Sequence, residues 1–163
     1  MANYLNRPSI FEIATAYEDG NNGYVSKQDD YEKVYNQLND KEKSLSWRHP
    51  FLAMKIKDNR EKAFRETSHF NGITDGYGDA IRHCYWCALN QVSAGLNSLD
   101  AKKFGDAHEN TSKNEINAKA MDLHNNSVGY YLGNQAIIND WSEEELLNQV
   151  INAANNGKLK IIK

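Results

Sequence analysis

Apolar residues recur through most of the chain at the three- and four-residue spacing of one helical face. In "KQDDYEKVYNQLN", which Ser26 precedes, Tyr31, Val34 and Leu38 follow this pattern and predict a helix. Pro8 and Pro50 precede two further helical patterns, "SIFEIATAY" and "FLAMKIKDNREKAFRE", and proline suits a first helical turn. The side chains expected to face inward from the second of these helices are Phe51, Met54, Ala63 and Phe64. "SLSWRHP" is expected to interrupt the helical pattern between "KQDDYEKVYNQLN" and "FLAMKIKDNREKAFRE".

Three more helices are expected at residues 78–94, 98–113 and 115–133, separated by "SAGLN" and by a break near "NTSKN". Ser142 and Glu145 have the spacing of a capping box for a last helix, "EEELLNQVINAANN". Gly157 suits the end of that helix. The tail "KLKIIK" is expected to be a short strand or an extended segment.

These elements predict a mainly α protein with one compact helical domain over residues 1–163, built from about six to seven helices. A chain of 163 residues is long enough to bury one core without metals or disulfides. Convincing alternating strands, sequence repeats and low-complexity tracts are absent from the sequence. The motifs discussed below occupy a core of about 45–135.

Composition and charge narrow the functional classes. The net charge of −3 gives no sign of an electrostatic grip on a nucleic-acid backbone. No apolar run approaches the ~20 residues of a transmembrane helix, and the first residues lack the pattern of a signal peptide. The localisation is left open, because both a cytoplasmic protein and an exported domain fit these features.

The two cysteines, Cys84 and Cys87, are spaced C-x-x-C. On a helix they lie about one turn apart, where a disulfide would close a short loop and stabilise little. The motif lacks the βαβ setting of a thioredoxin and the second thiol pair of a zinc site. Buried, reduced cysteines that pack as small apolar residues are therefore the favoured interpretation; a redox or zinc module is the competing one.

The segment "GDAIRHCYWCALN" carries the first cluster of polar residues. Asp79, His83 and Trp86 fall at positions i, i+4 and i+7, so they share one helical face, with Arg82 beside it. An aspartate and a histidine in this arrangement can bind one cation, or the aspartate can orient the imidazole as a general base. Arg82 offers a planar fork for a phosphate or carboxylate. A buried histidine held by hydrogen bonds explains this helix alone equally well.

A second cluster lies in "FGDAHEN", where His108 and Glu109 follow Asp106. His108 is expected to point inward. Gly105 inside a helix costs about 1 kcal/mol relative to alanine, which indicates either close backbone approach or room for a ligand. The segment does not match the H-E-x-x-H zinc motif.

The third cluster, "MDLHNN", places Asp122, His124, Asn125 and Asn126 within a turn and a half. Asparagines are unfavourable in the middle of a helix, so this group indicates a buried polar network or a ligand site. A helix that simply ends at "HNN" is the alternative.

Taken together, three of the five histidines lie within five residues of an aspartate on consecutive expected helices. Converging helices of this kind can build an acid–base or metal-dependent hydrolytic site. The proposed metal ligands are Asp79, His83, His108, Asp122 and His124. Mixed oxygen and nitrogen ligands favour Zn²⁺, Mn²⁺ or Mg²⁺, and Ca²⁺ fits if oxygen ligands dominate.

The segments "SWRHPFLAMKIKDNREKAF", "GDAIRHCYWCALN", "AKKFGDAHEN" and "MDLHNNSVGY" resemble, in order and spacing, an uncharacterised bacterial helical domain family. Its motifs read D-A-x-R-H-x-x-W, D-A-H-E and M-D-x-H-N-N-x-x-G. The resemblance implies a module of exported or polymorphic-toxin-like proteins, usually taken to be hydrolases. It also implies the candidate site residues Asp79, Arg82, His83, His108, Glu109, Asp122, His124 and Asn125. A fainter resemblance to small bacterial phospholipases A2 is limited to "RH", because those enzymes have an aspartate where Cys84 stands.

The first functional hypothesis is therefore a hydrolase whose Asp/His/Glu site activates water, with or without a bound metal. His83 or His108 is the expected base, Arg82 holds an anionic group, and Asn125, Asn126 and Trp86 complete the polar site. A phosphoester, lipid-linked or other cell-envelope substrate is expected, and a toxin would have a cognate immunity protein as partner. The alternative is a non-enzymatic helical binding module whose polar clusters form a structural network.

Overall fold

The computed structural model describes residues 34–72, 74–96, 98–109 and 116–162. The helices within these ranges are α3 (Asp40–Arg48), α4 (Pro50–Thr67), α5 (Tyr77–Ala94), α6 (Leu99–His108), α7 (Ile116–Asn139) and α8 (Glu143–Asn155). No strand occurs in the described ranges, so the mainly α prediction is confirmed. The helix expected at 8–17 and most of the one expected in "KQDDYEKVYNQLN", residues 27–39, lie outside the described ranges.

The contacts divide the chain into two compact units, residues 1–54 and 55–163. In the first unit, Asn39 and Glu42 form a capping box at the start of α3, with both reciprocal hydrogen bonds present. The expected interruption at "SLSWRHP" is wrong for most of its length. Helix α3 runs through "SLSWR" and ends at Arg48, with His49 as its C-cap directly before Pro50, because a residue before proline disfavours the α conformation.

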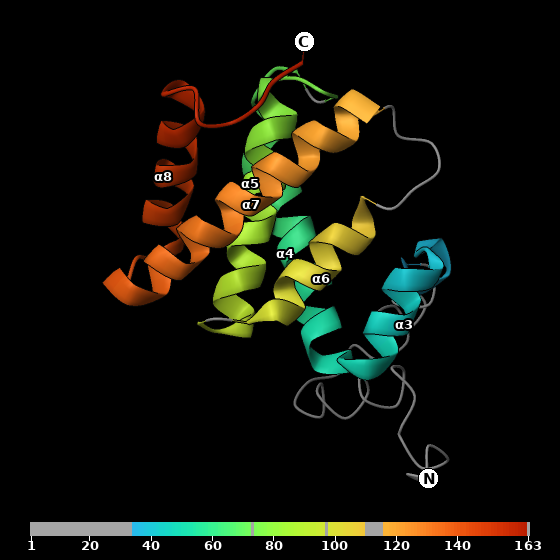
Figure 1. Ribbon diagram of the computed structural model, residues 1–163. Coiled ribbons are helices and arrows are strands. Elements are labelled where there is room, and N and C mark those ends of the chain that lie inside the picture. Colours follow the sequence, from blue (N-terminus) through green and yellow to red (C-terminus); the bar gives the residue numbers. More distant parts are fainter. Residues whose placement is uncertain (1–33, 73, 97, 110–115, 163) are drawn as a thin grey trace, which may run out of the picture. The chain divides into compact units, whose positions relative to one another are not determined.

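In the second unit, α7 crosses α5 (Figure 1), and these two helices share the most extensive packing. Their close approach depends on Gly129 of α7. A Cβ atom at this position would lie 2.3 Å from the carbonyl oxygen of Cys84 and 2.9 Å from Cβ of Cys87. Gly105 of α6 is likewise covered, here by the Tyr130 hydroxyl. Gly129 therefore allows close backbone approach, whereas the space at Gly105 is filled by the side chains of Tyr130 and Cys87 and not by another backbone.

Helix α4 departs from the expected inward pattern. Met54 and Ala63 are buried, but Phe51 and Phe64 are 56% and 48% exposed. The prediction that both phenylalanines face inward is wrong, because helical spacing identifies a face without fixing how far it is covered. In the second unit α4 joins α5 through polar contacts, such as the hydrogen bond from Asn59 Nδ2 to Asn90 Oδ1 (3.0 Å).

The last helix and the tail follow the sequence closely. Ser142 and Glu145 form the expected capping box of α8, and Gly157 ends it with a φ of +68°, a conformation that favours glycine. Residues 158–162 form neither a helix nor a strand, and the backbone bends at Leu159. Helix α7 continues six residues beyond its expected end, to Asn139. No helix in the described ranges is both long and apolar enough to cross a membrane.

Candidate functional site

Helix α5 positions two of the predicted site residues on one side. Asp79 stands in its first turn and His83 one turn later. The preceding loop fixes the aspartate: its backbone N–H donates to the Gly72 carbonyl (2.9 Å), and its Oδ2 accepts from the Asp75 N–H (2.7 Å). A carboxylate in a first helical turn also interacts favourably with the helix dipole. Hydrogen bonds within residues 72–79 therefore hold Asp79 in place.

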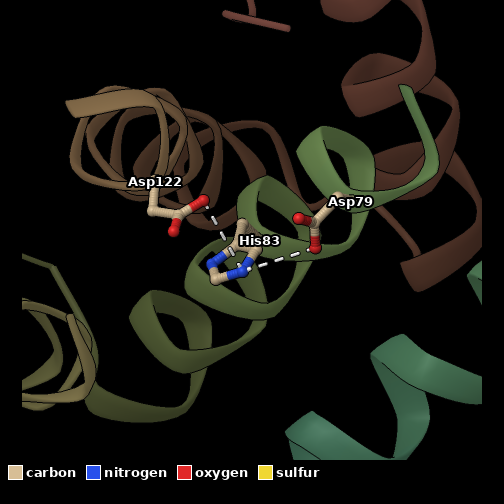
Figure 2. A group of neighbouring side chains, drawn as sticks. All are labelled: Asp79, His83 and Asp122. Carbon is tan, nitrogen blue, oxygen red and sulfur yellow. Dashed lines mark ion pairs between the residues drawn. The ribbon is translucent and has the colours of Figure 1, made fainter. Parts of the chain in front are cut away.

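His83 lies among three carboxylates that come from three helices or their ends. Figure 2 shows its ring between Asp79 of α5 and Asp122 of α7. Its Nε2 is 3.6 Å from Asp79 Oδ1 and 3.7 Å from Asp122 Oδ1, and its Nδ1 is 3.4 Å from Glu109 Oε1. These are ion-pair distances, longer than well-formed hydrogen bonds. The imidazole is the common centre of the group.

Glu109 directly follows α6 and is only 1% exposed. Its Oε1 accepts a hydrogen bond from Asn126 Nδ2 (3.2 Å). Asn126 lies one turn after Asp122 on α7, so one face of that helix supplies both a carboxylate and the amide that holds another. Glu109 is thus fixed on the Nδ1 side of His83, opposite the two aspartates.

The electrostatics of the cluster follow from this crowding. Burial raises the pKa of Asp122 to about 6, opposed by His83 and reinforced by Glu109 and Asp79. Burial lowers the pKa of His83, but the three carboxylates outweigh it and raise the pKa above its usual value. For Glu109, burial raises the pKa, but His83, His108 and Asn126 together lower it by more than burial raises it. The net result is a pKa below the usual range for a glutamate. The protonation states of His83, Glu109 and Asp122 therefore depend on one another.

The cluster has an excess of negative charge. Three carboxylates face one imidazole and the guanidinium of Arg82, which donates to Asp79 Oδ1. Asp122 is 7% exposed, and its buried Oδ1 has no hydrogen-bond partner among the described residues. An unpaired buried carboxylate oxygen is unfavourable unless a cation or donor reaches it.

One group in the described ranges has the spacing of metal ligands: Asp79, His83 and Asp122, whose ligand atoms all lie within 4.8 Å of one another. Ligands bound at about 2.0–2.2 Å lie roughly 3 to 3.5 Å apart. The two separations from Nε2, 3.6 and 3.7 Å, slightly exceed this range, so the side chains would have to move closer to bind one ion. His108 and His124, predicted as ligands, fall outside this group.

A cavity of about 220 Å³ opens beside His83. The lining residues that bear on its chemistry are Arg60, Phe64, Arg82, His83, Trp86 and His108. Arg82 links this cavity to the carboxylates, because the same guanidinium that bonds Asp79 lies 4.5 Å from the Phe64 ring centre. The cavity therefore has a charged wall and an aromatic wall.

His108 and Trp86 form a pair at this cavity. Their rings meet edge to face with centres 5.1 Å apart, and the His83 ring centre is 6.4 Å from that of His108. Trp86 Nε1 donates to the Ile56 carbonyl (3.2 Å), which anchors the indole. His108 is thus placed near, though not against, His83.

The other two predicted residues of α7 serve the C-terminal segment. His124 Nε2 lies 2.9 Å from the Lys158 carbonyl oxygen. Asn125 makes paired hydrogen bonds with the backbone of Lys160, at 2.9 and 2.8 Å. Further along, the Ile162 N–H donates to the carbonyl of Asp75, at 3.0 Å, the residue whose N–H holds Asp79. This C-terminal clamp, residues 158–162, supports the site indirectly.

Cys84 and Cys87 are free and fully buried. Burial raises the pKa of both thiols above the usual value, which leaves them unreactive at neutral pH. Cys87 Sγ donates to the Tyr130 hydroxyl (3.3 Å). The interpretation of the cysteines as packing residues is confirmed.

Most predicted site residues meet around the His83 cluster and its cavity. The residues brought together are Asp79, Arg82, His83, Trp86, His108, Glu109, Asp122 and Asn126. His124 and Asn125 are directed to the C-terminal clamp instead. Sequence reasoning missed Arg60 and placed Phe64 in the core. Arg60 lies one turn before Phe64 on α4, a spacing that could have indicated a shared surface.

These features define an all-helical domain with a buried acid–histidine cluster beside a small cavity. The chain belongs to the family described as Domain of unknown function (DUF6973), whose model matches residues 43–158. No curated protein and no solved structure matches the chain.

Proposed function

We propose that this protein is a hydrolase that binds a divalent cation between Asp79, His83 and Asp122 and cleaves a phosphoester. The observation that carries the proposal is the position of His83. One of its ring nitrogens faces two aspartates at ligand spacing, and the ring also lines a cavity that contains arginines. A cation site and an anion site therefore adjoin.

A cation there would balance the cluster's excess negative charge and would reach Asp122 Oδ1, which has no hydrogen-bond partner among the described residues. Glu109, on the Nδ1 side of His83, accepts the second ring N–H, as carboxylates commonly do behind a metal-binding histidine. One imidazole and two carboxylates suit Mn²⁺ or Zn²⁺ better than Mg²⁺ or Ca²⁺. Assigned in this way, His83 is a ligand and not the general base.

A cation held by Asp79, His83 and Asp122 would act as a Lewis acid and would lower the pKa of a water to about 7. Water would add to phosphorus as the bond from phosphorus to the ester oxygen breaks. His108 supplies a proton to that oxygen and recovers the one that the water lost. The net change is addition of water, with a phosphate and an alcohol as products. Arg82 holds the phosphoryl oxygens on the cavity side.

The alternative of a purely structural polar network is less consistent with the cluster. A structural network is stable when every buried member is hydrogen-bonded, as Glu109 is by Asn126. Asp122 Oδ1 does not meet this condition among the described residues. A lipid-linked or cell-envelope substrate, and a toxin-like role with an immunity protein, stay predictions within the proposed function.

The experiment compares Asp122→Asn with Asp106→Asn, whose exposed carboxylate pairs with Lys102 outside the cluster. Each protein is stripped of metal and titrated with Mn²⁺ by calorimetry, then assayed on a panel of phosphoesters. We expect stoichiometric Mn²⁺ binding and Mn²⁺-dependent turnover in the parent protein and in Asp106→Asn, and loss of both in Asp122→Asn. Equal behaviour of the two variants, or a parent protein without cation binding and turnover, contradicts the proposal.

A further inference from the structure

The cavity holds two arginines in different electrostatic states. Arg82 is bonded to Asp79 and is largely buried, so a carboxylate already balances much of its charge. Arg60 is exposed, and its guanidinium lies over the Phe64 ring, whose centre is 5.7 Å from its Cζ. Within the described part of the chain, no carboxylate pairs with Arg60. Its five N–H donors remain available to an anion.

The charges change sign across the cavity. The carboxylate cluster lies behind His83, whereas Arg60, Arg82 and His108 line the cavity itself. A ligand that fits this arrangement reaches the cation site with one anionic oxygen and the guanidinium of Arg60 with another. A phosphate group with several free oxygens can do both, and bidentate arginine contacts suit its geometry.

The size of the cavity limits what is attached to that phosphate. Its volume of about 220 Å³ is below the roughly 300–1,000 Å³ of pockets that hold drug-sized ligands. There is room for a phosphate and one small group against Phe64 and Trp86. A phosphomonoester has three free oxygens, one for each of the cation, Arg60 and Arg82, whereas a second ester substituent would remove one of the three.

We propose that the cavity selects phosphomonoesters over phosphodiesters, with Arg60 as the residue that recognises the free phosphate oxygens. This inference rests on the proposed function for its reaction but concerns binding, which can be measured without turnover. The cleaved bond is the single ester P–O bond, and the products are inorganic phosphate and an alcohol.

Inorganic phosphate and dimethyl phosphate are the probes, titrated by calorimetry into the full chain with and without Mn²⁺. We expect phosphate to bind at least tenfold more tightly than dimethyl phosphate. Arg60→Ala should lower the phosphate affinity by about ten- to hundredfold, since charge-assisted hydrogen bonds contribute about 1.5–3 kcal/mol and 1.4 kcal/mol corresponds to tenfold. Arg60→Ala should also remove most of the preference.

Arg65→Ala is the matched control, because Arg65 is an exposed arginine of the same helix that pairs with Glu66 and does not line the cavity. Circular dichroism checks that all variants fold. Equal affinity for the two probes, or unchanged phosphate affinity in Arg60→Ala, overturns the inference. Phosphate preference that depends on Arg60 without any ester hydrolysis supports the inference and contradicts the proposed function, so the two failures are distinguishable.

Discussion

Two neighbouring residues of α5, His83 and Cys84, occupy opposite environments. His83 faces three carboxylates and a cavity, whereas Cys84 is enclosed where Gly129 of α7 contacts the α5 backbone. Both side chains have a raised pKa, but for different reasons. For Cys84 the cause is burial alone, while for His83 the carboxylates overcome burial. The comparison teaches that a raised pKa indicates chemistry only when charged partners cause it.

The largest expected effect is the difference between substitutions at His83 and at Cys84. His83→Gln should abolish Mn²⁺ binding and lower phosphoester turnover by at least about 100-fold, because it removes the central ligand and the ring N–H facing Glu109. Cys84→Ala, one residue away, should leave both unchanged. Calorimetry and steady-state kinetics on the two variants give the measurement. Comparable losses of Mn²⁺ binding and turnover in both variants would contradict the functional distinction between His83 and Cys84.

Where α7 packs against α5 around Cys84, Gly129→Ala should lower the free energy of unfolding by about 3 kcal/mol or more. The added methyl group would meet backbone, the Cys84 carbonyl at 2.3 Å, which cannot rotate away. Ser127→Ala, at an exposed position of the same helix, is the control and should change stability by less than about 1 kcal/mol. Urea unfolding measures both. A mild effect at Gly129 would mean that α5 and α7 can separate at little cost.

Because of the carboxylate cluster around His83, the free energy of unfolding of the metal-free protein should fall as pH rises from about 4 to about 7. Asp122 has a folded-state pKa of about 6, above its unfolded value, so the folded state binds the extra proton and loses this advantage as pH rises. The raised pKa of His83 acts in the same direction, above pH 6.5. Glu109, whose pKa is lowered, acts oppositely, but only near and below its unfolded value.

Asp122→Asn should therefore stabilise the metal-free protein at pH 7 by roughly 2 to 3 kcal/mol at most, since one pKa unit corresponds to about 1.4 kcal/mol. It should also flatten the pH dependence. Thermal unfolding in chelator between pH 5 and pH 8 tests this. A stability that rises across that interval in the parent protein would contradict the charge arrangement described for the cluster.

The smallest effect concerns the thiols. In the native protein neither cysteine should react with a thiol reagent at pH 7.5, because burial raises the pKa of both and thiolate is the reactive form. Both should react once the protein is unfolded in guanidinium. Rapid labelling of the folded protein would show that the interface between α5 and α7 opens readily.

Helical spacing predicted the cluster where its partners share a helix. Asp79 and His83 are four residues apart, as are Asp122 and Asn126, and each pair lies on one face. The same geometry explains the residues that lie elsewhere. At about 100° per residue, His124 lies on the opposite side of α7 from Asp122, and Asn125 lies to one side of it. Both contact the C-terminal clamp.

The cavity was harder to predict than the cluster. Arg60 lies in the charged run "KDNREK", which resembles any solvated helical face. Its role depends on where α4 meets α5, and such long-range packing is not encoded by local periodicity. Phe64 was misplaced for the same reason, since an aromatic residue at inward spacing can form the wall of a cavity instead of filling a core.

The C-terminal clamp also sets the order in which the site can be completed during synthesis. Asp79 is oriented by Asp75, and Asp75 is in turn bonded to Ile162, which leaves the ribosome long after α5. A growing chain that has already formed α5 to α7 therefore still lacks this last support.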